Sequence, residues 1–366
     1  MGSRHMDSLY FDWARQAPRH MLNKDDFLWA LDMIREKEYK NLMEEARGLL
    51  SKLLDSDTDE IALLPSGEAA VNIISLSIPI SVRDRVILVR DDYPGIIVPW
   101  LKSMGRGLRI SFVDAVEGKI KVDEFVKILD ETVLLKAFSH VHHLTGARRG
   151  IKGISMYLEE TGGYIYVDAT HSLGCISIDV KKDRVHILSA DVDRWLSPLS
   201  GVGILYIRKE VQRVIDPIII TSLNTVWEKN ALTYKLGRGG ARYEAYRLSE
   251  ISLALLIKSI RDLFRYGVKK AENRILTLGG WLIDELTNMG YDVSTPYDRE
   301  ERAGIISIKT GEANRLKKYL EERGILVSGL DGYLRISIHY RHLDRDIERL
   351  IDGFKEGGRR LGLLPS

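Results

Sequence analysis

The sequence predicts an α/β fold, with a large domain built on a mainly parallel sheet and a small C-terminal α+β domain. Short runs rich in β-branched residues alternate with segments whose apolar residues recur at helical spacing. This alternation is typical of a parallel sheet covered by helices on both faces. A long helical stretch replaces it from residue 248. We therefore expect the large domain over residues 7–247 and the small one over residues 248–366, while residues 1–6, "MGSRHM", resemble an expression-tag remnant.

The elements of the large domain follow from these patterns in order. Residues 27–54 carry apolar side chains at helical spacing with charges between them, which predicts one or two amphipathic helices. Residues 153–162 show another helical pattern between two predicted strands. Buried strands are expected at the β-branched runs, which are residues 85–90, 108–114, 133–141, 164–169, 185–190 and 203–209.

The C-terminal part begins with a long helical pattern over residues 248–290. After it, strands and helices alternate again, and the segments are a strand at 303–310, a helix at 314–324, a strand at 333–340 and a helix at 344–357. This order predicts a compact α+β unit. The sequence contains no internal repeat and no low-complexity segment.

Composition narrows the classes of partner and compartment. The 54 basic and 52 acidic residues give a net charge of +2, so we expect neither nucleic-acid nor membrane binding. No apolar run approaches the ~18 residues of a membrane span. The single cysteine, Cys175, excludes an internal disulfide and favours the cytoplasm. Glutamine occurs only at Gln16 and Gln212 and charge is dense, which predicts a thermophilic source.

Several stretches along the chain carry a resemblance to one enzyme family. They are "LYFDWARQAP" (9–18), "DDYPGIIVPW" (91–100), "FSHVHHLTGARRGIKGI" (138–154), "YIYVDATHSLGCISIDV" (164–180), "DRWLSPLSGVGILYIRKE" (193–210) and "GYLRISIHY" (332–340). In this order they resemble the class V aminotransferase and cysteine desulfurase family, enzymes of fold type I that use pyridoxal phosphate (PLP). The resemblance covers about residues 9–352. It implies a mainly parallel sheet of seven strands and a homodimer with active sites at the subunit interface.

The resemblance gives three residues a role that the family retains. Asp168 stands where an aspartate pairs with the protonated ring nitrogen of PLP, although an aspartate at a strand end also commonly caps a turn. Tyr93 stands where an aromatic side chain stacks on the ring, although a core tyrosine would read the same way. Arg335 stands where the family binds the substrate carboxylate, a role that suits the planar fork of arginine.

The lysine that bonds PLP in the family is replaced here by Arg194. A neutral amine is needed to attack an aldehyde, and lysine can be tuned to supply one. A guanidinium has a pKa above about 12 and stays protonated. The resemblance therefore implies that position 194 cannot form the family's covalent bond to the cofactor.

The resemblance also places five residues in the cradle of the cofactor phosphate, and they are Ser66, Gly67, Glu68, Asp191 and Asp193. Three of them are carboxylates where a dianion should bind, and two unit charges 4 Å apart repel by about 4 kcal/mol at an intermediate dielectric. Gly240 lies near the position of a phosphate-binding threonine from the partner subunit. We therefore expect no covalent PLP in this cradle.

Two histidines stand where the family has polar partners of the ring oxygen. His143 and His171 would point at one spot if the fold is kept, and Asp168 would lie on the same floor. Two histidines and a carboxylate resemble the ligands of a zinc or non-haem iron site, which predicts Zn or Fe where the cofactor was. The alternative is that both histidines are hydrogen-bonding groups, since His140 and His142 already share one face of the predicted strand.

Three functions remain open from the sequence. The first is a PLP-independent, metal-assisted enzyme, with His143, His171 and Asp168 as ligands or acid–base groups and with Arg335 and Arg194 holding an anionic or amino-acid-like substrate. The second is a catalytically silent homodimeric partner protein, in which Arg194 neutralises Asp168, Asp191 and Asp193 in an internal ion network. The third is a PLP enzyme of the aminotransferase or lyase type that holds the cofactor non-covalently.

Conventional transaminase or cysteine desulfurase activity is not expected. Cysteine desulfurases of this family need a cysteine on a loop near the carboxylate-binding arginine, and residues 303–342 contain none. Cys175 follows an apolar turn and is typical of a buried small hydrophobic residue.

Overall fold

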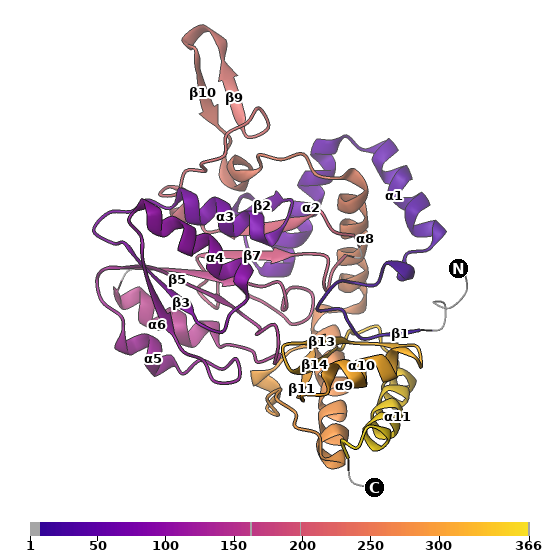
Figure 1. The fold of residues 1–366 in the computed structure, drawn as a ribbon. Coiled ribbons are helices and arrows are strands. Elements are labelled where there is room, and N and C mark those ends of the chain that lie inside the picture. Colours follow the sequence, from indigo (N-terminus) through magenta and orange to yellow (C-terminus); the bar gives the residue numbers. More distant parts are fainter. Residues whose placement is uncertain (1–7, 162, 198, 365–366) are drawn as a thin grey trace.

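A seven-stranded sheet forms the centre of the larger part of the computed structural model, which describes residues 8–161, 163–197 and 199–364 (Figure 1). Its strand order is β2-β8-β7-β6-β5-β3-β4. The strands are β2 (Ile61–Leu64), β3 (Arg85–Val89), β4 (Arg109–Val113), β5 (Val133–Ser139), β6 (Tyr164–Asp168), β7 (Ile187–Asp191) and β8 (Gly203–Ile207). Strands β3 to β7 are parallel, and β8 runs antiparallel to both β7 and β2. The predicted α/β fold with a mainly parallel sheet of seven strands is confirmed.

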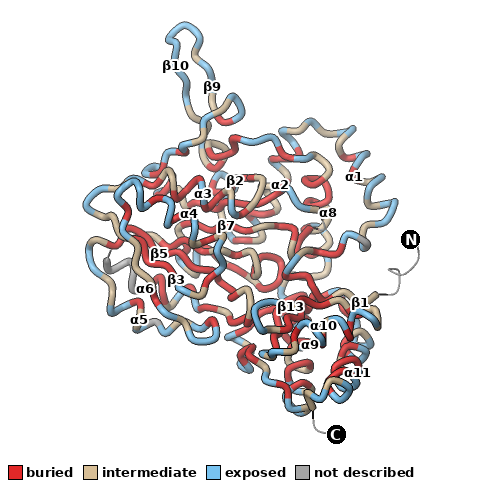
Figure 2. Tube along the Cα trace, viewed as in Figure 1, coloured by how far each residue is buried: buried red, intermediate tan, exposed pale blue. Residues whose placement is uncertain are grey.

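Helices cover both faces of this sheet. The strands carry apolar side chains on both faces, and the helices bury them. On β3, Val86 and Leu88 pack into one apolar cluster while Ile87 and Val89 pack into the other. Helices cover the two faces, and their bounds are α1 (Lys24–Glu36), α2 (Tyr39–Leu54), α3 (Gly67–Ser77), α4 (Pro94–Ser103), α5 (Val122–Lys127), α6 (Ile151–Thr161) and α7 (Lys209–Gln212). The buried residues run as a continuous layer through the strands (Figure 2).

The smaller part is built on a three-stranded antiparallel sheet of order β11-β14-β13. Its strands are β11 (Ile305–Lys309), β13 (Ser328–Leu330) and β14 (Tyr333–Ser337), and its helices are α10 (Ala313–Glu321) and α11 (Asp344–Arg360). Helices α8 (Glu250–Tyr266) and α9 (Val268–Met289) connect it to the large sheet. Gly267 separates them with φ of +100°, a conformation that favours glycine. The long helical pattern therefore forms two helices.

Two arrangements were not predicted. Strand β1 (Leu9–Tyr10) pairs in parallel with β12 (Ile325–Leu326), so the N-terminal segment joins the C-terminal unit. Strands β9 (Thr225–Glu228) and β10 (Thr233–Leu236) form an antiparallel hairpin that projects from the body (Figure 1). The short 3₁₀ helices are Arg19–Met21, Thr58–Glu60, Met104–Arg106, Lys229–Ala231, Gly239–Tyr243 and Arg299–Glu301. None of the helices in the described ranges is long and apolar enough to span a membrane.

A lysine is buried inside the sheet. Lys136 is in the middle of β5 and fully buried, and its Nζ has no hydrogen-bond partner among the described residues. The amine lies 5.3 Å from the centroid of the Phe125 ring. Burial lowers the pKa of Lys136 from 10.5 to about 7, because the charged amine loses its hydration.

Replacement of this lysine tests the cost of its burial. The unfolded chain binds a proton between about pH 7 and pH 10.5 that the folded chain does not, so the free energy of unfolding rises with pH in that window. We expect Lys136→Met to stabilise the protein at pH 7 by about 1–3 kcal/mol and to remove that rise. Urea denaturation at pH 7 and pH 9 measures both effects, with exposed Lys152→Met as control. Destabilisation, or an unchanged pH dependence, would contradict this account.

Candidate functional site

A cavity of about 460 Å³ lies where the parallel strands end, beside β13 and β14. Ligands of open α/β sheets bind outside the carboxyl ends of the strands, so this is the expected place for a site. The cavity brings together residues that the sequence singled out, and they are Gly67, Glu68, Tyr93, His143, Asp168, His171, Asp191, Arg194 and Arg335. Ser66 and Asp193 do not line it but contact residues around it.

Asp168 ends β6 and presents its carboxylate to the floor of the cavity. One carboxylate oxygen accepts a hydrogen bond from the backbone N–H of Thr170 at 2.9 Å, and the other accepts one from the hydroxyl of Ser139 at 3.4 Å. Burial raises the pKa of Asp168 to about 6, since its charged form is desolvated there. The carboxylate is thus poised to accept a hydrogen bond from a protonated ring.

The two histidines of the cavity are neutral donors or acceptors at pH 7. Burial is the main cause that lowers the pKa of His143 to about 4, and it also holds the pKa of His171 well below its usual range. The Nδ1 atoms of both rings are buried and have no hydrogen-bond partner among the described residues. His143 also packs edge-on against Tyr93, with ring centroids 5.5 Å apart. Both rings can therefore bond a ligand.

The N-terminus of α3 forms the opposite end of the cavity. Ser66 caps this helix, and its hydroxyl accepts the backbone N–H of Ala69 at 3.0 Å. The N–H of Gly67 donates to the Asp191 carboxylate at 2.8 Å. A Cβ at Gly67 would lie 2.9 Å from the carbonyl carbon of Ala190, so glycine is required for α3 to start this close to β7. A helix N-terminus attracts anions, and here the chain's own carboxylate occupies it.

Arg194 completes this end of the cavity as part of an ion network. Its guanidinium bonds the carboxylate of Asp193 and lies 3.6 Å from that of Asp191. Burial raises the pKa of Asp193, and the positive charge of Arg194 opposes that shift. A further hydrogen bond holds the backbone of Asp191, whose N–H donates to the Thr170 hydroxyl at 3.2 Å. Arg194 therefore pairs with Asp191 and Asp193, whereas the carboxylate of Asp168, which was expected in the same network, is bonded by Thr170 and Ser139.

Arg335 lies on β14 and lines the cavity, and the sequence did not predict its partners within the chain. It donates from Nη1 to the carbonyl oxygen of His143 at 2.9 Å, and its Nη2 lies 3.7 Å from the carboxylate of Asp12. The hydroxyl of Ser328 bonds the same carboxylate. The Nε of Arg335 is buried and has no partner in the part of the chain that the structure describes. Arg335 thus lines the cavity while its guanidinium is held by His143 and Asp12.

Sequence reasoning missed further residues of the site. Arg15 and Lys317 line the cavity from segments remote in sequence. The buried Arg149 bonds Asp92 at 2.6 Å, and the Asp92 carboxylate accepts the backbone N–H groups of Ser139 and Tyr93. This buried pair fixes the end of β5 and the turn that holds Tyr93. Arg15, Arg149 and Lys317 belong to no motif or regular spacing in the sequence, so the sequence gives no signal that they lie at the site.

The residues fit PLP well at one end of the cavity. The buried carboxylate of Asp168, the unpartnered Nδ1 atoms of His143 and His171 and the face of Tyr93 suit a protonated pyridine ring with a hydroxyl. At the other end a phosphate would meet Asp191, which already accepts the Gly67 N–H. The ring end therefore fits directly, and the phosphate end requires Asp191 to give up its place on α3.

Comparisons with known proteins show which sequences and structures this chain is similar to. The chain is 22% identical over 316 residues to an uncharacterized aminotransferase, YcbU of Bacillus subtilis, covering 86% of this chain and 84% of the other. It superposes on the apo cysteine desulfurase of Thermococcus onnurineus with a TM-score of 0.86 and 20% identity, over 96% of this chain and 94% of that one. A lysine-to-alanine mutant of C-DES, with glycine covalently linked to its PLP cofactor, matches with a TM-score of 0.86 and 18% identity, over 95% and 96% of the two chains.

These findings correct the sequence-based prediction on cofactors. The expectation of no covalent PLP, with Zn or Fe in its place, is wrong. The fold is shared with a protein in which PLP is covalently linked to an amino acid even in a lysine mutant. Within the described ranges, no three His, Cys, Asp or Glu residues are grouped so that they could hold a metal ion. His143, His171 and Asp168 all line the cavity, but they are not grouped closely enough to hold a metal ion.

The family itself is shown by a match over most of the sequence. The model of the aminotransferase class-V family matches residues 33–350, which include both sheets and every residue of the candidate site except those of the N-terminal segment. The chain therefore belongs to the class V aminotransferase family.

Proposed function

We propose that the cavity binds PLP and acts on a small amino acid or a related anionic amine. The observation that carries this proposal is that one cavity is lined both by the Asp168 carboxylate, whose pKa burial raises to about 6, and by the Arg335 guanidinium. When bound, PLP withdraws electrons from the bonds next to the amine of a substrate. The remaining functions belong to the chain's own side chains.

Three of these side chains position the reactants. Asp168 accepts the proton-bearing nitrogen of the ring, and its fixation by Thr170 and Ser139 keeps it in place. Arg335 binds the substrate carboxylate through charge-assisted hydrogen bonds. The neutral rings of His143 and His171 hold the ring hydroxyl, or accept a proton from the substrate, since burial keeps both unprotonated at pH 7.

Arg194 determines which molecule must supply the amine that reacts with the cofactor. It stands where the family has its lysine, and a guanidinium cannot supply a neutral amine. An amine that reacts with PLP in this cavity would therefore have to come from the substrate, and glycine is the group linked to PLP in the C-DES mutant. Persulfide chemistry is not part of the proposal, because the only cysteine in the sequence, Cys175, is buried and desolvation raises its pKa far above neutrality.

A silent homodimeric partner protein is the second candidate function. The hydrogen bond from the Gly67 N–H to Asp191 favours it, because this bond fills the anion position of α3 from within the chain. In that case the Asp191–Arg194–Asp193 network replaces the charges of a ligand and serves stability alone.

The first test concerns the amine. We expect glycine to tighten PLP binding by the wild-type protein by about tenfold or more, because the substrate must supply the amine. We expect Arg194→Lys to remove this dependence on glycine, since lysine supplies the amine itself. Equilibrium dialysis of PLP with and without glycine measures both effects, with Arg15→Lys, a second arginine of the same cavity, as the matched control.

The outcomes separate the two candidate functions. Wild-type protein that binds no PLP in either condition supports the silent partner. PLP binding that glycine leaves unchanged in the wild type, or a glycine dependence that survives in Arg194→Lys, contradicts the proposed role of position 194.

We further propose that two copies of the chain form a homodimer through the hairpin β9–β10. Much of this hairpin is exposed (Figure 2), and its exposed large apolar residues are Val226, Trp227, Leu232 and Tyr234. Trp227 is 60% exposed to solvent and Val226 is 63% exposed. Apolar patches on a projecting segment are typical of protein–protein contacts. A second copy is the partner that the family resemblance implies.

The oligomeric state tests this contact. We expect light scattering to give about twice the chain mass of 41.6 kDa for the wild type. Trp227→Ser should weaken the dimer by about tenfold or more, because truncation of a large aromatic contact typically costs over 1 kcal/mol. Met156→Ser removes an exposed apolar side chain elsewhere and should leave the mass unchanged. A wild type that is monomeric at all concentrations would contradict the proposal.

A further inference from the structure

Two residues of the candidate site, Tyr93 and Asp168, are connected to one buried ion pair. Arg149 bonds the carboxylate of Asp92 at 2.6 Å, and both side chains are only 1% exposed. Asp92 directly precedes Tyr93 in the chain, and Arg149 lies between β5 and α6. Neither Arg149 nor Asp92 lines the cavity. The pair can therefore affect a ligand only indirectly, through neighbouring residues.

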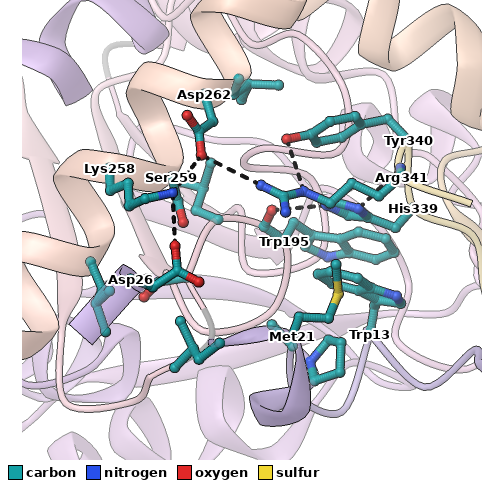
Figure 3. Close-up of a pocket in the computed structure, with 17 residues that line it drawn as sticks. Trp13, Met21, Asp26, Trp195, Lys258, Ser259, Asp262, His339, Tyr340 and Arg341 are labelled. Carbon is teal, nitrogen blue, oxygen red and sulfur yellow. Dashed lines mark hydrogen bonds and ion pairs between the residues drawn. The ribbon is translucent and has the colours of Figure 1, made fainter. Parts of the chain in front are cut away.

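The burial of this pair distinguishes it from the ion pairs at the cavity of about 60 Å³ beside α8. There Lys258 lies 2.9 Å from Asp26 and 3.2 Å from Asp262, and these side chains are 15–31% exposed (Figure 3). Water screens the charges of such pairs, so they have little effect on other groups. A buried pair loses its hydration on folding, and apolar residues of similar volume often stabilise a protein equally well. Stability alone is therefore a weak explanation of the buried pair between Arg149 and Asp92.

The Asp92 carboxylate holds two backbone segments together. Its Oδ1 accepts the backbone N–H of Tyr93 at 2.9 Å, and its Oδ2 accepts that of Ser139 at 2.8 Å. Tyr93 is the N-cap residue of α4, and Ser139 is the last residue of β5. One carboxylate thus fixes the turn that carries Tyr93 against the end of β5.

Ser139 links the Asp92 carboxylate to that of Asp168. Strands β5 and β6 pair in parallel with Ser139 opposite Asp168, and the Ser139 hydroxyl donates to the Asp168 carboxylate at 3.4 Å. The same residue donates its backbone N–H to Asp92. Two carboxylates that share one small residue repel each other, and this repulsion favours protonation of one of them. The charge of Asp92 must therefore be balanced if Asp168 is to stay ionised.

Arg149 supplies this balance, and every nitrogen of its guanidinium forms a hydrogen bond. Nη1 donates to the Asp92 carboxylate and, at 3.2 Å, to the carbonyl oxygen of Ser139. Nη2 donates to the Asp91 carboxylate at 3.2 Å, and Nε donates to the carbonyl oxygen of Gly118 at 2.9 Å. Burial favours the neutral form of Asp92, but the charge of Arg149 and the hydrogen bonds of Ser139 lower its pKa below the usual value. The planar fork and permanent charge of arginine suit this position.

Two carboxylates raise the pKa of Asp168, and each has an arginine partner. Burial is the main cause of the raised pKa, and the negative charges of Asp92 and Asp191 add to it, against the hydrogen bonds that Asp168 accepts. Arg149 pairs with Asp92. Arg194 pairs with Asp191, although its side chain is 23% exposed. The ionisable side chains that line the cavity with Asp168 also include Glu68, Tyr93, His143, His171 and Arg335.

We propose that Arg149 is a positioning residue that balances Asp92, so that Asp168 keeps its negative charge. Through the same carboxylate, Arg149 also fixes Tyr93. This role rests on the proposed function, in which Asp168 accepts the proton-bearing ring nitrogen, because an ionised carboxylate forms the stronger hydrogen bond. Without Arg149, Asp92 and Asp168 would compete for a proton across Ser139.

NMR titration of the Asp168 carboxyl, in protein labelled at aspartate and free of PLP, tests this role, and Asp168→Asn identifies the signal. We expect Asp92→Asn to lower the pKa of Asp168, with a change of about threefold or more in its acid dissociation constant, because it removes a negative charge and leaves Arg149 unbalanced. Arg149→Met should raise this pKa, because the charge of Asp92 is then unopposed. The double variant Asp92→Asn/Arg149→Met removes both charges and should restore the wild-type value.

Glu244→Gln is the matched control, because it breaks an ion pair at 2.8 Å between Glu244 and Arg47, neither of which lines the cavity. It should leave the pKa of Asp168 unchanged. Thermal unfolding shows which variants fold, and Arg149→Met provides a second route if Asp92→Asn does not fold. The role is overturned if the single variants shift this pKa in the same direction or not at all, or if the double variant keeps the shift of Asp92→Asn. Opposite shifts support the role whether or not PLP binds, and failure to bind PLP contradicts the proposed function alone.

Discussion

The hydrogen bond from the Gly67 N–H to the Asp191 carboxylate is the constraint on which the candidate site depends. It ties the start of α3 to the end of β7, and the lack of a side chain at Gly67 lets the two elements approach. The carboxylate takes the place that an anionic ligand would have at a helix N-terminus. Arg194 pairs with the same carboxylate and so balances this internal anion.

The two ends of the cavity therefore differ in how far their polar groups are paired within the chain. At one end of the cavity, burial leaves groups short of partners: Asp168 has a raised pKa, and His143, His171 and Arg335 each have one nitrogen without a hydrogen-bond partner in the described part of the chain. Such unsatisfied groups are stabilised when a ligand binds. At the other end, Asp191 and Arg194 satisfy each other and the helix. Under the proposed function, a phosphate would have to displace Asp191 from α3, whereas the ring would meet groups that lack hydrogen-bond partners among the described residues.

The sequence predicted most of the sheet but not its edges or its distant contacts. Strands with β-branched runs were found because they are buried on both faces, as β3 and β5 are. The four-residue β2 was not singled out, because a short antiparallel strand has no pattern of its own. Residues of the site were placed through the resemblance, whereas Lys317 and Asp12 reach it only through the packing of the small unit and the N-terminus. The metal prediction was wrong because residue types were counted without the geometry that ligation requires.

The affinity of PLP for Asp191→Ser, compared with that for the wild type, tests this account most directly. Serine frees the Gly67 N–H and removes one negative charge from the helix N-terminus. We predict that PLP binds Asp191→Ser about tenfold or more tightly, a gain of about 1.4 kcal/mol for each factor of ten. Glu68→Gln removes a charge nearby without freeing the helix and should change the affinity by less than about threefold. Equal affinities for Asp191→Ser and the wild type would contradict the central claim.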